Sequence, residues 1–121
     1  MPWYLTTRMD TESLRSRYLP ERVRVLMVGE SPPAGGTFFY AGNSNLFRYT
    51  CDAFAAVYGQ RWSRPEDFLR FFTDEGFFLD DLCLVPVNNM TAADRRRCRR
   101  DGVPSLSKRL KDYLPDAIAV T

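Results

Sequence analysis

The chain has 121 residues, 45% hydrophobic and 26% charged, with a formal net charge of +2, and these values predict a single globular domain over residues 1–121. It contains no histidine, which excludes histidine triads and histidine zinc ligands, and its three widely spaced cysteines indicate neither a disulfide framework nor a metal site. No apolar run approaches the roughly 20 residues that span a membrane and no signal peptide is recognisable, so we expect a cytoplasmic protein without a membrane partner. We expect no metal, and no cofactor either, because the glycine-rich loop matches neither a P-loop nor a dinucleotide fingerprint.

The first third of the chain predicts a short helix, a buried strand and a long loop. Residues 11–18 place apolar side chains on one face of a helix, and the β-branched run of residues 23–28 is typical of a buried strand. Prolines and glycines then exclude both helix and strand over residues 31–41. Loops of this length inside a small domain are commonly functional.

Two helices with recognisable ends follow this loop. Asn43 or Ser44 provides the cap of the first helix. Its apolar positions repeat at helical spacing to about Tyr58, and Gly59 ends it. Pro65 lies in the first turn of the second helix, where the acids that follow it suit the positive end of the helix dipole.

The last part of the chain predicts two more strands and one more helix. Residues 76–85 are typical of a buried strand, and residues 117–120 predict a third strand. Residues 86–102 are predicted to form a basic loop with at most a turn of helix, and residues 104–114 a helix. The order of strands and helices predicts an α/β fold in which helices cover both faces of a central parallel sheet, a three-layer α/β/α arrangement.

The most informative residues follow the first predicted strand. Gly29 ends that strand and Glu30 comes directly after it, so this carboxylate lies at the edge where open α/β folds bind their ligands. There it can act as a general base for water or stabilise a developing cation; the alternative is an acid that caps the next turn or pairs with an arginine. The loop aromatics Phe38, Phe39 and Tyr40 either stack on a flat ring or pack in the core.

Two acids interrupt the second predicted strand. Asp80 and Asp81 are adjacent, so their side chains alternate between opposite faces, and one of them is expected to point inward or lie at the sheet edge. A buried acid needs partners. It either reads a ligand at the end of the strand or forms an ordinary helix cap or a salt bridge to the arginines that follow.

Basic residues are concentrated in the second half of the chain. Residues 84–111 carry eight Lys and Arg against two Asp, a net charge of +6, which leaves −4 for the rest of the chain. Such a segment suits a phosphate backbone, and the alternative is a solvated helix face. The five arginines at its centre, here called the arginine cluster, are Arg95, Arg96, Arg97, Arg99 and Arg100.

Taken in chain order, these residues resemble the uracil-DNA glycosylase superfamily. The likeness is greatest to the bacterial and archaeal branch whose first motif is Gly-Glu-x-Pro-Gly, and here Gly29-Glu30-Ser31-Pro32 is followed by Pro33 in place of the last glycine. Phe39 matches the phenylalanine that stacks on a flipped base in that family. Asp81 takes the place of an asparagine that reads the base edge.

The resemblance covers residues 23–121 and implies a uracil-DNA glycosylase-like fold of which the chain is the N-terminal part. It implies hydrolysis of the N-glycosidic bond of uracil or another deaminated base in DNA, with Glu30 activating water and with no metal. The arginine cluster would contact the DNA backbone. The pocket for the flipped base would be formed by Gly29, Ser31, Phe39 and Asp81.

The chain also departs from the pattern of that family. The iron–sulfur cysteines of the branch and the histidine-containing last motif are absent. An ionised Asp81 accepts hydrogen bonds but cannot donate one as an asparagine amide does. These departures favour the alternative, a non-catalytic nucleic-acid- or protein-binding module with the same fold. The sequence does not indicate the oligomeric state.

Overall fold

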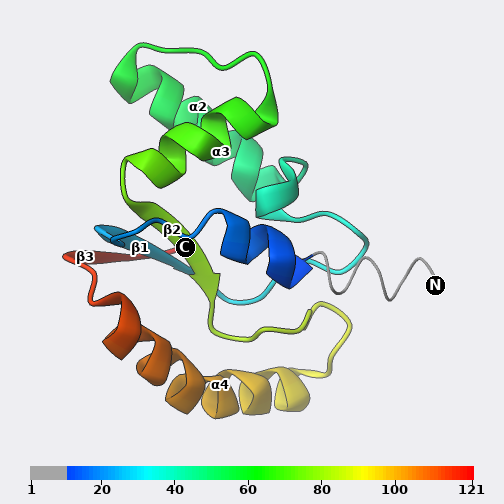
Figure 1. The fold of residues 1–121 in the computed structure, drawn as a ribbon. Coiled ribbons are helices and arrows are strands. Elements are labelled where there is room, and N and C mark those ends of the chain that lie inside the picture. Colours follow the sequence, from blue (N-terminus) through cyan, green and yellow to red (C-terminus); the bar gives the residue numbers. More distant parts are fainter. Residues whose placement is uncertain (1–10) are drawn as a thin grey trace.

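The structure, a computed structural model, describes residues 11–121, so the first ten residues of the predicted domain lie outside the described residues. Residues 11–121 form a mixed α/β fold with a three-stranded parallel sheet and four helices. Figure 1 shows α2 (Asn45–Tyr58) and α3 (Pro65–Asp74) on one side of the sheet and α4 (Ala92–Tyr113) on the other. The remaining helix, the first in the chain, covers residues 11–17 and carries no label in Figure 1.

The sheet forms where the sequence predicts strands. β1 (Val25–Gly29) lies in the centre, and β2 (Phe77–Asp81) and β3 (Ala117–Val120) pair with it in parallel, so the predicted parallel sheet is confirmed. β1 and β2 are shorter than predicted. In their register Gly29 lies beside Asp81, so the two strands end at the same level. The side chains that follow both strands therefore lie at one edge of the sheet.

Both ends of α2 and the start of α3 are also those predicted. The side chain of Ser44 accepts a hydrogen bond from the backbone N–H of Phe47, which caps α2. Gly59 ends α2 with a φ of 65°, a conformation that glycine adopts without a steric penalty. Pro65 occupies the first turn of α3. Local sequence signals are enough to set these three boundaries.

The hydrophobic core is largely aromatic and lies between the sheet and the helices α2 and α3. Tyr40, from the short 3₁₀ helix Phe39–Ala41, is 1% exposed within it. Its hydroxyl accepts a hydrogen bond from Leu79 N at 2.6 Å and donates one to Leu79 O at 3.0 Å. The loop is therefore fixed to the edge of β2 that β1 leaves open. The other large core side chains are Leu26, Phe38, Phe39, Phe47, Phe68, Leu69, Phe72, Phe78 and Leu79.

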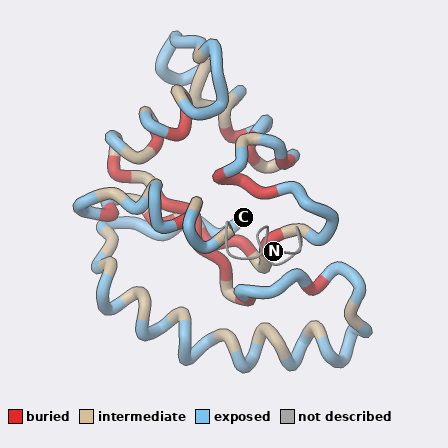
Figure 2. Tube along the Cα trace, turned by 45° about the vertical axis from the view of Figure 1, so that its right-hand side comes forward, coloured by how far each residue is buried: buried red, intermediate tan, exposed pale blue. Residues whose placement is uncertain are grey.

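The basic segment differs from the prediction. The predicted helix over residues 104–114 is confirmed to Tyr113, but the predicted loop is wrong over residues 92–102, because α4 begins at Ala92 and runs without a break through Gly102 and Pro104. Thr91 caps its first turn, a signal that the sequence prediction missed. Figure 2 shows no buried residue along α4. Ion pairs of Arg95 and Arg99 before this proline and of Arg109 after it hold α4 to the rest of the protein.

Candidate functional site

A pocket lies at the carboxyl ends of β1 and β2. The loop that follows β1 and the start of α2 form its other walls. Its volume is about 260 Å³, slightly below the roughly 300 Å³ at which pockets for drug-sized ligands begin. This volume suits a single small ring system. Three predicted site residues line it together, and its lining includes Ser31, Pro33, Phe38, Phe39, Ser44 and Asp81.

Gly29 lets the end of β1 approach the acid on β2. Gly29 is buried beside Asp81, and a Cβ at this position would lie 2.6 Å from Oδ1 of Asp81. Any other residue would push the carboxylate or the strand aside. The predicted role of Gly29 in the pocket is thus indirect: it positions Asp81 and is not itself part of the lining.

Phe39 lines the pocket, but most of its ring is packed in the core. The side chain is 2% exposed. Its ring centroid lies 5.0 Å from that of Tyr40, 5.8 Å from that of Phe47 and 5.3 Å from that of Phe72. Core packing is one of the two alternatives that the sequence leaves open for this residue, and here it occurs together with a place in the pocket wall.

Asp80 and Asp81 are both buried, at 1% and 4% exposure, so burial is not confined to one of the two acids. Arg15 donates to Oδ1 of Asp80 at 3.4 Å and to Oδ2 of Asp81 at 3.2 Å. On the side of α4, Oδ2 of Asp80 pairs with Arg109 and accepts a hydrogen bond from the Tyr113 hydroxyl at 2.9 Å. These salt bridges come from outside the arginine cluster.

Arg15 is the residue that the sequence analysis missed. It is 5% exposed, and its guanidinium lies 5.2 Å from the centroid of the Phe38 ring. A signal was present, because two acids in an apolar strand require a buried cation. Arg15 also lies three residues before Tyr18, on the same face of the helix that covers residues 11–17.

Burial shapes the ionisation of this buried pair. Burial raises the pKa of Asp81, and the guanidinium of Arg15 offsets only part of this effect. Burial by itself lowers the pKa of Arg15, but the attraction of Asp81 and Asp80 outweighs it, so the pKa of Arg15 is raised. Arg15 therefore remains a cation, and its positive charge is available to balance an ionised Asp81.

Glu30 follows β1 directly but is held by the arginine cluster and does not line the pocket. Arg95 donates to it from Nε at 2.8 Å and also from Nη2, and Arg99 donates from Nη1 at 2.9 Å. The hydrogen bonds from Arg95 and then Arg99 lower the pKa of Glu30 to about 2. The carboxylate is ionised at neutral pH, but it is a weak proton acceptor in this arrangement.

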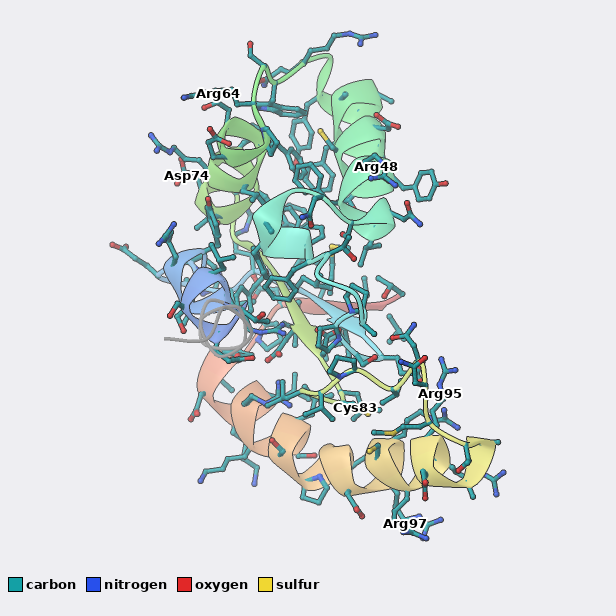
Figure 3. All side chains as sticks on the ribbon, turned by 90° about the vertical axis from the view of Figure 1, so that its right-hand side faces the viewer. Arg48, Arg64, Asp74, Cys83, Arg95 and Arg97 are labelled. Atoms are coloured by element: carbon teal, nitrogen blue, oxygen red, sulfur yellow. The ribbon has the colours of Figure 1, made fainter. Side chains whose placement is uncertain are left out.

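The arginine cluster is divided between two faces of α4. Arg95 and Arg99, one helical turn apart, face Glu30. Figure 3 shows Arg95 on the side of α4 toward the rest of the molecule and Arg97 on the side away from it. The exposed members of the cluster are Arg96, Arg97 and Arg100.

Comparisons with known proteins give no match: no family model, curated protein or solved structure matches this chain. Within residues 11–121, no helix is both long and apolar enough to cross a membrane. The same residues contain no group of three or more His, Cys, Asp or Glu placed to hold a metal ion. Arguments about function therefore rest on the geometry of the pocket and of its neighbouring charges.

Proposed function

We propose that the pocket takes up one flipped base of a DNA strand and that the chain hydrolyses the N-glycosidic bond of that base. The proposal includes the finer fold prediction, a three-layer glycosylase-like domain. The observation that carries it is the pocket itself, which joins Ser31, Phe39 and Asp81 at the end of the strand that leads into Glu30. Enzymes that act on a base inside a duplex must extrude it into such a pocket.

The chemistry assigns different roles to the pocket and to Glu30. Phe38 and Phe39 provide the apolar wall against which a flat ring packs, and Asp81 provides the polar end. Positive charge develops on the sugar as the glycosidic bond breaks, and the carboxylate of Glu30 offsets that charge and orients water. With a pKa of about 2, Glu30 acts through its negative charge more than by taking a proton.

Binding of DNA has to change the contacts of Glu30 before it can act in this way. Arg95 and Arg99, whose side chains are 43% and 42% exposed, can turn from Glu30 to phosphate oxygens. Such an exchange frees the carboxylate only when a nucleic-acid backbone is present. The outer arginines of the cluster supply further phosphate contacts.

One observation favours a second candidate, a non-catalytic nucleic-acid-binding module. Two arginines, Arg95 and Arg99, bind the single carboxylate of Glu30, so these ion pairs link the end of β1 to the start of α4. In this candidate the carboxylate of Glu30 has a structural role and takes part in no catalytic step. In that case the pocket binds an extruded or single-stranded base without cleaving it.

Incubation with labelled oligonucleotides separates the two candidates. Single- and double-stranded substrates that each carry one test base are assayed for abasic sites, with Glu30→Gln as the variant and the exposed Glu21→Gln as the matched control. A glycosylase loses about 10²-fold or more of its rate in Glu30→Gln and none in Glu21→Gln. Oligonucleotide binding without abasic sites on any substrate supports the binding module, and the absence of both rejects both candidates.

A further inference from the structure

Asp81 is the only ionisable residue among the described residues that line the pocket. The rest of the lining consists of apolar side chains, prolines and neutral polar groups. An ionisable group in an otherwise neutral pocket dominates the choice of ligand, because an unpaired charge there is costly. The state of its two carboxylate oxygens therefore decides which rings the pocket accepts.

The two oxygens of Asp81 have different surroundings. Oδ2 accepts a hydrogen bond from Arg15 Nη2 at 3.2 Å, on the side of the short N-terminal helix. Oδ1 lies against the Cα of Gly29 and accepts no hydrogen bond from any of residues 11–121. The side chain is 6% exposed, so bulk water solvates little of it. One acceptor atom of Asp81, at the pocket that this side chain lines, thus lacks a donor within residues 11–121.

Arg15 makes the ionised form of Asp81 possible despite its burial. The guanidinium is buried to the same extent as the carboxylate and pairs with it directly, and with Arg109 on Asp80 two cations match the two acids. Asp80 does not compete for this role in the pocket, because its oxygens are occupied by Arg15, Asp81 N, Tyr113 and Arg109. An ionised carboxylate only accepts hydrogen bonds.

We propose that the pocket selects a heterocycle whose edge presents N–H donors to Asp81, namely a ring N–H beside an exocyclic amino group, as in the edge of guanine. The inference rests on the proposed function and narrows its base class. Such an edge gives two charge-assisted hydrogen bonds to one carboxylate. Uracil and thymine instead flank their ring N–H with carbonyl oxygens, which face the lone pairs of the carboxylate and repel them.

The test compares two rings of equal size in the full chain, without any need for turnover. Isocytosine carries an amino group beside its ring N–H, whereas uracil carries a carbonyl there. Binding of each free base is measured by ligand-observed NMR and by titration of backbone amide shifts at residues of the pocket. We expect isocytosine to bind roughly tenfold tighter than uracil or more, since one well-placed pair of hydrogen bonds discriminates by about this factor.

Asp81→Asn is the diagnostic variant and the exposed Asp74→Asn is its matched control. The amide donates as well as accepts, so Asp81→Asn should abolish or reverse the preference, and Asp74→Asn should keep it. Equal binding of both rings, or tighter binding of uracil, by the unmodified chain overturns the inference and leaves the base pocket in place. Failure of both rings to bind removes the pocket as a base site and with it the proposed function. The comparison in the unmodified chain decides the matter even if Asp81→Asn does not fold.

Discussion

Replacement of Tyr40 by phenylalanine tests whether a single hydroxyl holds the site together. This hydroxyl both donates to and accepts from the backbone of Leu79, two residues before Asp81. Burial raises the pKa of Tyr40 far above its usual value, so the phenol stays neutral and keeps its proton for donation. Tyr40→Phe removes only the oxygen and leaves the ring contacts in the core unchanged.

The structure sets the expected cost. Without the hydroxyl, the buried N–H of Leu79 has no partner, whereas its carbonyl keeps a hydrogen bond from Arg15 at 3.3 Å. A buried donor left unpaired costs about 1–3 kcal/mol, and the lost bond to the carbonyl adds to this. We therefore expect Tyr40→Phe to lower the free energy of unfolding by about 2–3 kcal/mol, a large share of the 5–15 kcal/mol typical of a domain.

Urea denaturation followed by fluorescence measures this loss. A change of about 2 kcal/mol moves the midpoint by roughly 1 M at an unchanged slope. Tyr58→Phe is the control, because this tyrosine is 41% exposed and its hydroxyl forms no hydrogen bond within residues 11–121. The free energy of unfolding should therefore change by no more than about 0.5 kcal/mol in this variant. Equal costs for Tyr40→Phe and Tyr58→Phe would refute the argument that the hydroxyl fixes the edge of β2.

Three further predictions concern the neighbouring residues. The lowered pKa of Glu30 contributes stability that is present above its unfolded value of 4.5 and is lost as the pH falls through about 2. The unmodified chain should therefore exceed Glu30→Gln in unfolding free energy by about 1 kcal/mol for this partly exposed pair, and this difference should shrink over that pH range. A difference that stays constant contradicts the ion pair. Gly102→Ala should destabilise the domain measurably in urea, because its Cβ would lie 2.3 Å from the Leu82 carbonyl oxygen; an unchanged midpoint would show that α4 does not rest on that carbonyl. Gly29→Ala should weaken binding of oligonucleotides more than it lowers stability, because the Cβ displaces Oδ1 of Asp81 in the pocket, and unaltered affinity in a folded variant would separate Asp81 from recognition.

A further prediction concerns DNA, which is the partner in the proposed function, and the exposed arginines of α4. Each phosphate contact that is lost should flatten the dependence of log affinity on log salt by about 0.9 units in duplex DNA. The double variant Arg96→Gln, Arg100→Gln should thus reduce the slope by roughly 2 units. Arg70→Gln, on α3 across the sheet, should leave it unchanged. An unaltered slope in the double variant identifies this face as merely solvated.

The sequence by itself determined the features that depend on neighbouring residues. The strand at β1, the cap of α2 at Ser44, its end at Gly59 and the opening of α3 at Pro65 are set by local backbone preferences. The position of Glu30 at the end of β1 follows directly from the strand that precedes it. The sequence pattern failed where a helix has no apolar face to reveal it, as in the first half of α4, and it extended β2 beyond its end at Asp81.

Only the tertiary structure decided which charges meet. Arg15 reaches Asp80 and Asp81 across 65 and 66 residues of chain, and Arg95 reaches Glu30 across 65. Several arginines were available to each acid, and sequence spacing does not rank partners so far apart. The choice depends on how the helices lie on the sheet, because a buried charge pairs with the cation that packing places beside it. The same packing brought Arg95 and Arg99 to Glu30, which is one of the two alternatives that the sequence left open for this acid, and it left Asp81 in the pocket.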